Sequence, residues 1–125
     1  MSEERFSILY VDDELINLRL FKSALRRDFN IYLAESGQEG LEILSKEKID
    51  LIITDQMMPK MNGTDFLREV KNKFPDVQIP KMILSGYSQS ADVKKAIEEY
   101  DLKKFISKPW NVEELKSQIN EAIGI

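Results

Sequence analysis

Residues 49–55 read Ile-Asp-Leu-Ile-Ile-Thr-Asp, a short run that is apolar at most positions and ends in a carboxylate. Successive side chains of a β-strand point to opposite faces of its sheet. A strand in which consecutive residues are apolar therefore has apolar side chains on both faces. Such a strand is buried on both sides, as in parallel sheets that lie between two layers of helices. The run predicts the central strand of an α/β fold, with Asp55 at its carboxyl end.

Outward from this run, apolar segments alternate with segments whose apolar residues recur at helical spacing. The expected strands are residues 6–11, 30–34, 49–54, 81–85 and 104–107. A helix is expected after each strand, the fourth over roughly residues 88–100. Five βα units of this kind predict a parallel sheet with helices on both faces, and right-handed crossovers leave few topologies open.

Local signals mark several helix starts. Ser36 stands three residues before Glu39, the spacing of a capping box, and Asn111 stands in the same relation to Glu114. Pro59 and the Asn62-Gly63 pair are turn-forming residues and mark a loop after the central strand.

Length and composition limit the classes of function. The 125 residues fit one domain, residues 1–125, which leaves no effector domain in this chain. The net charge of −4 argues against direct nucleic-acid binding. The chain contains neither cysteine nor histidine, so a bound metal must take oxygen ligands. No apolar run approaches the ~20 residues of a membrane span, and the start lacks the features of a signal peptide. We therefore expect a cytoplasmic protein.

Polar side chains gather where the expected strands end. Asp12 and Asp13 follow the first strand, Asp55 follows the third, Ser85 ends the fourth and Lys108 follows the fifth. In open parallel sheets ligands bind outside the carboxyl ends of the strands, near the point where the strand order reverses. These residues are therefore the candidate functional site.

The chemistry of this set points to phosphoryl transfer. Three neighbouring carboxylates repel one another, and a hard cation such as Mg²⁺ relieves the repulsion. Carboxylates form aspartyl-phosphate intermediates, so Asp55 is a candidate nucleophile. Lys108 supplies a compact positive charge for one phosphoryl oxygen, and the Ser85 hydroxyl a hydrogen bond for another.

Four motifs together resemble response-regulator receiver domains along essentially the whole chain. They are Leu-Tyr-Val-Asp-Asp-Glu at 9–14, Asp-Gln-Met-Met-Pro at 55–59 followed by Asn62-Gly63, Leu-Ser-Gly at 84–86, and Ser-Lys-Pro at 107–109. The resemblance implies a flavodoxin-like (βα)5 three-layer sandwich, with a central parallel five-stranded sheet in the order 2-1-3-4-5.

The resemblance also implies roles for the acidic residues. Asp55 is the expected phospho-acceptor. Asp12, Asp13 and Asp55, with the backbone carbonyl of Met57, are the expected ligands of Mg²⁺, which Mn²⁺ can replace.

The remaining implied roles concern the response to phosphorylation. Lys108 is expected to contact the phosphoryl group through its side chain and to precede a cis peptide bond to Pro109. Ser85 is expected to move onto the phosphoryl group and Phe105 to rotate with it. The surface of helix 4, strand 5 and helix 5 would then change.

Partners follow from the same resemblance. The donor would be a sensor histidine kinase or a phosphotransfer protein, and the output an unknown partner or a fused effector domain. We expect a monomer or weak homodimer, and no enzyme activity beyond slow self-phosphorylation and self-dephosphorylation.

Other interpretations remain open at this point. Asp12 and Asp13 would also be favourable at the N-terminus of a helix, which carries partial positive charge. Lys108 could be an ordinary exposed lysine, and Phe105 an ordinary core residue. A pseudo-receiver would act only as a binding module, but would be expected to lack part of the acid, serine and lysine set. A haloacid-dehalogenase-type phosphatase would use Asp12 as nucleophile, but its motif needs an aspartate where Glu14 stands. A flavin-binding protein would need a phosphate-binding loop where this chain carries acids.

Overall fold

The computed structural model of the chain describes residues 5–76, 78–85, 102–107 and 110–124, with Ser85 and residues 102–107 described by their backbone alone. The expected helix over residues 88–100, and Lys108 with Pro109, lie outside these residues. The described elements follow the predicted alternation: β1 (Ser7–Val11), α1 (Leu15–Leu25), β2 (Asn30–Ala34), α2 (Gly37–Lys46), β3 (Leu51–Asp55), α3 (Gly63–Lys73), β4 (Lys81–Ser85), β5 (Leu102–Ser107) and α5 (Val112–Ile123).

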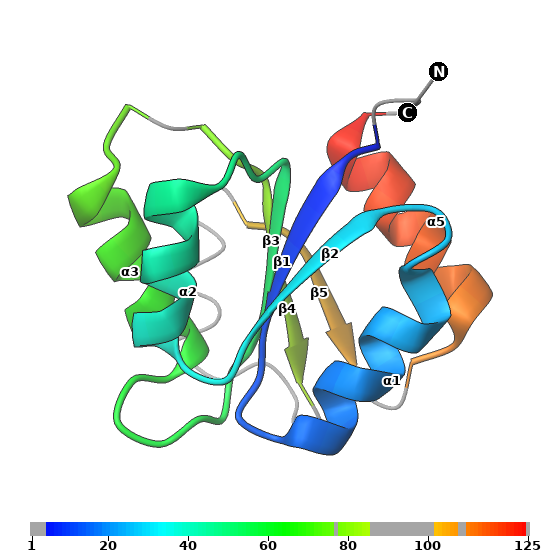
Figure 1. Ribbon diagram of the computed structural model, residues 1–125, viewed down its shortest axis with the longest axis horizontal. Helices are drawn as coiled ribbons and strands as arrows, with labels where there is room; N and C mark the ends of the chain where they lie inside the picture. The colour runs from blue at the N-terminus through cyan, green and yellow to red at the C-terminus, as the bar shows by residue number, and fades with distance from the viewer. Residues whose placement is uncertain (1–4, 77, 86–101, 108–109, 125) are drawn as a thin grey trace.

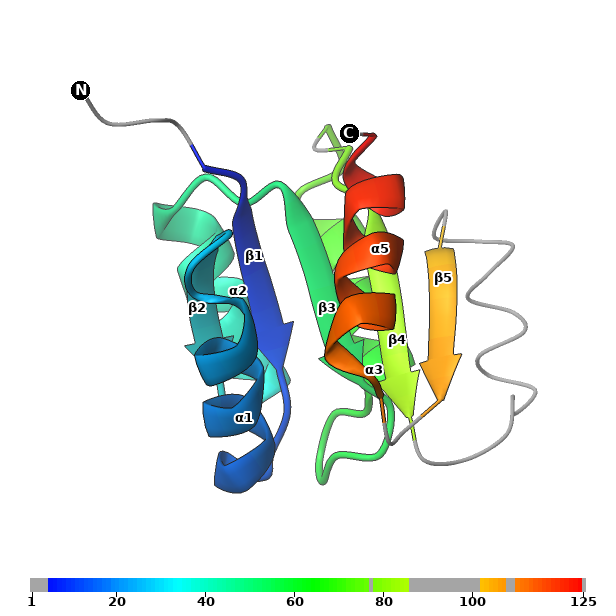
Figure 2. The same ribbon diagram turned by 90° about the vertical axis from the view of Figure 1, so that its right-hand side faces the viewer.

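The five strands form one parallel sheet in the order β2-β1-β3-β4-β5, which confirms the predicted topology. Helices α1 and α5 cover one face of this sheet, and α2 and α3 cover the other (Figures 1 and 2). β1 and β3 lie side by side, but the chain crosses from β1 toward one edge of the sheet, to β2, and from β3 toward the other edge, to β4. The switch point of the sheet therefore lies between β1 and β3.

Each strand of the sheet centre contributes to two cores. Along β1, Leu9 and Val11 are buried with Ile52 and Phe66 in the core under α2 and α3. Ile8 and Tyr10 alternate with them and are buried in the core under α1 and α5, with further members Leu18, Phe21, Leu115 and Ile119. Because β1 is buried on both faces, its sequence shows no alternation of apolar and polar residues.

The central strand begins two residues later than its sequence predicts. Ile49 and Asp50 precede β3, and the Asp50 N–H donates to the carbonyl of Ser7 at 2.8 Å. The Asp50 carboxylate also accepts from the Ser7 N–H at 2.8 Å, so the side chain closes the start of the β1–β3 pair. Asp55 is the last residue of β3, opposite Leu84 of β4.

The helix caps are partly those expected. The Ser36 hydroxyl accepts from the Glu39 N–H, and the Asn111 side chain accepts from the Glu114 N–H, which confirms both predicted starts. A complete reciprocal capping box instead forms between Asn62 and Asp65 at the start of α3. The sequence alone marks Asn62 only as a loop residue.

Among the described residues, no helix has both the length and the apolar character that crossing a membrane requires.

Candidate functional site at the carboxyl edge of the sheet

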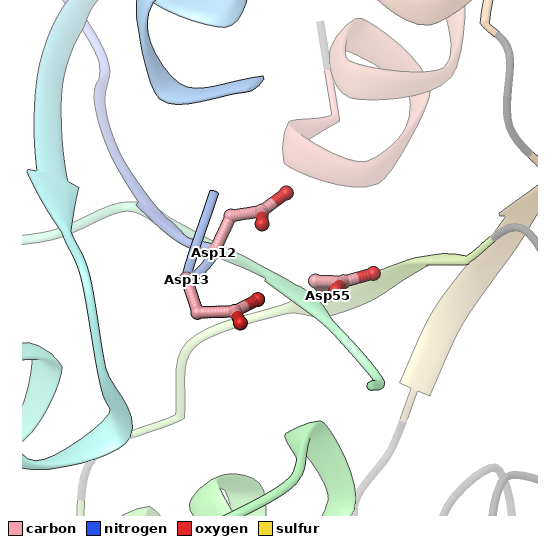
Figure 3. A group of neighbouring side chains, drawn as sticks. All are labelled: Asp12, Asp13 and Asp55. Carbon is pink, nitrogen blue, oxygen red and sulfur yellow. The ribbon is translucent and has the colours of Figure 1, made fainter. Parts of the chain in front are cut away.

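The carboxylates of Asp12, Asp13 and Asp55 meet at the carboxyl edge of β1 and β3, as Figure 3 shows. One oxygen from each lies within 4.8 Å of the others. The two strands are neighbours with Val11 opposite Thr54, so the residues that end or follow them emerge side by side. Asp12 and Asp55 are buried, whereas Asp13 is exposed to solvent. Three of the predicted site residues are therefore brought together at the switch point of the sheet.

Asp12 is held by donors from its own segment. Its Oδ2 accepts from the Tyr10 hydroxyl at 2.5 Å and from Asn17 Nδ2 at 3.1 Å. Its Oδ1 accepts from the Glu14 N–H at 3.0 Å. The N-cap of α1 is Glu14, which makes no side-chain capping bond. Asp12 therefore does contact the backbone at the entry to α1, while two further donors hold its carboxylate next to the other acids.

Tyr10 contributes to this edge although the sequence interpretation missed it, and the same is true of Asn17. The Tyr10 ring is fully buried and stacks on Phe21, with centroids 4.2 Å apart and planes at 27°. Burial is the main cause, and the charge of Asp12 the next, of a pKa of the Tyr10 hydroxyl well above its usual range. The group therefore stays a proton donor. The available signal was the spacing: residues two apart in a strand share one face, which places Tyr10 on the side of Asp12.

Gln56 connects the start of the loop after β3 to the start of α3 by hydrogen bonds. The Gln56 side chain accepts from the Thr64 N–H at 3.0 Å and donates to Thr64 Oγ1 at 3.3 Å. The Gly63 N–H donates to the Gln56 carbonyl at 3.0 Å. These three bonds join the residue after Asp55 to the start of α3, and so fix where the intervening loop begins and ends.

Met57 and Lys60 lie within this loop. The Met57 side chain is 58% exposed beside the acidic edge. Lys60 has a φ of 68° in a tight turn closed by the Met61 N–H on the Pro59 carbonyl at 2.7 Å. Apart from glycine, residues rarely adopt a positive φ, and such strain is often found at functional sites. The metal-binding role of the Met57 carbonyl stays a prediction.

Three further predicted residues have a less complete placement. Ser85 is the last residue of β4, opposite Ser107 of β5, so its backbone reaches the same edge as Asp55. Phe105 lies in β5 opposite Ile83. Lys108 lies outside the described residues. The roles of Ser85, Phe105 and Lys108 stay predictions.

The donor set fits a hard divalent cation. Carboxylate oxygens are the ligands that Mg²⁺ prefers, and two carboxylates that are buried beside a third carry repulsion that a cation relieves. The chain contains no cysteine and no histidine, so it offers neither the thiolate nor the imidazole ligands that zinc sites use.

A parallel sheet in the order 2-1-3-4-5, with three carboxylates at its switch point, is the architecture of a phospho-accepting signalling domain. The chain belongs to the response regulator receiver domain family, whose sequence profile matches residues 8–120. This membership removes the reason to consider a haloacid-dehalogenase-type phosphatase or a flavin-binding protein.

Relatives and solved structures agree with this assignment. The hydrogenase transcriptional regulatory protein HoxA of Bradyrhizobium diazoefficiens is 33% identical over 119 residues, which are 95% of this chain and 24% of that protein. A response regulator receiver domain protein from Clostridium thermocellum superposes with a TM-score of 0.80 at 35% identity, covering 95% of this chain and 94% of that one. The signal receiver domain of an HD domain-containing protein from Pseudomonas fluorescens gives a TM-score of 0.88 at 25% identity, covering 97% and 96%.

The relatives are longer proteins. The chain spans 25% and 24% of the length of the HoxA proteins of Cupriavidus necator and Bradyrhizobium diazoefficiens.

Proposed function

We propose that this receiver domain accepts a phosphoryl group on Asp55 and holds a divalent cation on Asp12, Asp13 and Asp55. The observation that carries the proposal is the meeting of these three carboxylates within 4.8 Å at the carboxyl edge of β1 and β3. Asp55 ends a buried central strand and is 5% exposed, so a phosphoryl donor would approach it from this edge.

Mg²⁺ would be held by the three carboxylates with the backbone carbonyl of Met57, and Mn²⁺ would serve in its place. When bound, the cation supplies positive charge that neutralises the acids and the incoming phosphoryl oxygens.

The chain's own residues would then act as follows. One Oδ of Asp55 forms a bond to phosphorus while the bond from phosphorus to the donor nitrogen breaks, and the leaving imidazole keeps the electron pair. Lys108 and the Ser85 hydroxyl contact the phosphoryl oxygens. Chemistry of this kind depends on positioning and charge compensation, and needs no further catalytic group.

A phosphohistidine of a sensor histidine kinase or a phosphotransfer protein is the donor in this proposal. The first two turns of α1, which follows Asp12 and Asp13 in the chain, and the loop after Asp55 carry exposed apolar side chains. These are Leu15, Ile16, Leu20 and Met57. Exposed apolar side chains that gather next to a reactive group are suited to a protein partner. The donor protein would dock on this surface. We propose that this transfer takes place in the cytoplasm.

The output follows from the new charge. Ser85 would move toward the phosphoryl group and Phe105 would follow it, so the surface of β5, α5 and the segment between β4 and β5 would shift between two packings. An effector domain fused to this chain, or a separate partner, would bind one of the two states. We propose a monomer or weak homodimer that neither binds nucleic acid directly nor acts as an enzyme beyond its own phosphoryl chemistry.

The test is phosphorylation by a small donor. The protein is incubated with acetyl phosphate, with and without Mg²⁺, and its intact mass is read promptly. One phosphoryl adduct that requires Mg²⁺ and is absent in Asp55→Asn is the expected result. Asp76→Asn is the matched control, because Asp76 is an exposed aspartate beyond the far end of α3 and should leave the adduct unchanged.

Rapid hydrolysis of the adduct would conceal it, so beryllofluoride, which mimics the phosphoryl group, is added in parallel. A protein that neither forms the adduct nor binds beryllofluoride with Mg²⁺ would be a pseudo-receiver that serves only as a binding module.

A further inference from the structure

We propose that Tyr10 is a positioning residue for the cation site: its hydroxyl orients the Asp12 carboxylate toward Asp13 and Asp55 and thereby sets the affinity for Mg²⁺. The inference rests on the proposed cation site and extends it to a residue that lies beneath the ligands. It starts from the bond of 2.5 Å between the Tyr10 hydroxyl and Asp12 Oδ2.

Asp12 is fully buried. Its side chain has no exposed surface, so protein donors must replace the water that an ionised carboxylate would otherwise bind. The donors assigned to Asp12 Oδ2 are Tyr10 and Asn17, at 2.5 and 3.1 Å. Hydrogen bonds to an ionised acceptor are short and strong, and the Tyr10 bond is the shorter of the two. Tyr10 is therefore a principal restraint on the orientation of this carboxylate.

Tyr10 is itself held in place by packing. Its ring is fully buried and stacks on Phe21 at 4.2 Å, and Phe21 in turn meets Trp110 edge-on at 6.3 Å. A donor on a ring clamped between β1 and α1 cannot follow Asp12 if that side chain rotates. A donor fixed by packing holds a ligand in place, and such supporting bonds typically change metal affinity by about 10- to 100-fold when removed.

Another tyrosine in the same sheet shows what an ordinary hydroxyl contact looks like here. Tyr32 of β2 is partly buried, and its hydroxyl lies 3.5 Å from the exposed carboxylate of Glu47. A buried tyrosine usually finds some partner for its hydroxyl, so a hydrogen bond alone would not separate a positioning role from core packing. The difference is that the acceptor of Tyr10 is a member of the acidic cluster.

The experiment compares Tyr10→Phe with Tyr32→Phe, each of which removes one hydroxyl and keeps the ring. Binding of Mn²⁺ is followed by the electron paramagnetic resonance of the free ion, and Mg²⁺ affinity by competition. We expect Tyr10→Phe to weaken the binding of both ions by about tenfold, and Tyr32→Phe to leave it unchanged. Asn17→Ala removes the second donor to the same oxygen without opening the core, and should weaken binding in the same direction.

A purely structural role has a different signature. If Tyr10 only packed the core, Tyr10→Phe would change urea unfolding in metal-free buffer and leave the affinity for Mn²⁺ as in the wild type. That result would overturn the inference, as would tighter binding, which would mean that the hydroxyl competes with the cation. A wild-type protein that binds neither ion would instead overturn the cation site itself, and the inference with it.

Discussion

Gly63 lies directly against the backbone carbonyl of Asp55, so close that a Cβ at residue 63 would overlap this oxygen. The same Cβ would also meet the side-chain oxygen of Gln56 at 2.9 Å. The contact joins the first residue of α3 to the proposed phospho-acceptor, and it explains why the chain needs a residue without a side chain there.

Gly63→Ala should therefore lower both stability and phosphorylation. The backbone at Asp55 is part of β3 and cannot move away cheaply, so we expect a loss of about 1–3 kcal/mol in the free energy of unfolding. The displaced Asp55 should also take up phosphate from acetyl phosphate more slowly. Gly124→Ala is the control: Gly124 has a φ of 94° but no atom near its added Cβ, so only stability should fall, by about 1 kcal/mol. Equal phosphorylation rates in both variants would contradict the role of the contact.

Asp13→Asn should raise stability in metal-free buffer. Three carboxylates within 4.8 Å repel one another in the folded state, and Asp13 is the exposed member of the set. Removing its charge should add roughly 1 kcal/mol to the free energy of unfolding, a value reduced by solvent screening. Urea titrations without metal give this value.

The same variant should lose the stabilisation by Mg²⁺. A ligand that binds only the folded state stabilises it in proportion to the logarithm of its concentration. The wild type should therefore gain stability as Mg²⁺ is added, and Asp13→Asn should gain little. Asp76→Asn should behave like the wild type, and an equal gain in all three proteins would refute the cation site.

Asn62→Ala should destabilise the start of α3 by about 1 kcal/mol, because the Asn62 side chain accepts from the Asp65 N–H at 2.8 Å and from Thr64 Oγ1 at 2.9 Å. The measurement is urea unfolding monitored by circular dichroism. Asn72→Ala, at an exposed position inside the same helix, should instead be neutral or slightly stabilising, since alanine is the better helix former. The prediction fails if the two variants are equally stable.

Lys60→Gly should be more stable than Lys60→Ala. At a φ of 68° a residue with a Cβ is strained, and the left-handed conformation costs it about 1–2 kcal/mol. Glycine relieves this strain but loses about 0.5–1 kcal/mol in unfolded-chain entropy. Both variants lack the lysine side chain, so they can be compared directly. Chemical unfolding should give the glycine variant a free energy of unfolding higher by about 0.5–1 kcal/mol. Alanine as the more stable variant would mean that the turn carries no strain.

The architecture was open to prediction because it depends on local pattern. The apolar run that ends at Asp55 indicated a strand buried on both faces, and alternation with helical segments then required a parallel sheet. Ser36 and Asn111 cap their helices as expected, since a cap involves residues only three apart. The Asn62-Gly63 pair is typical of turns and predicts a loop, whereas in the structure Asn62 caps α3 together with Asp65.

The order of strands and helices along the chain follows from local sequence pattern, as does the identity of the residues at the carboxyl ends of the strands. The approach of Asp12, Asp13 and Asp55 to within 4.8 Å of one another, and the hydrogen bond from the Tyr10 hydroxyl to Asp12, depend on how the chain folds in space. The physical reason is separation along the chain. Strand periodicity and helix caps are set within a few residues, whereas the meeting of β1 with β3 depends on how two helical layers bury the sheet between them.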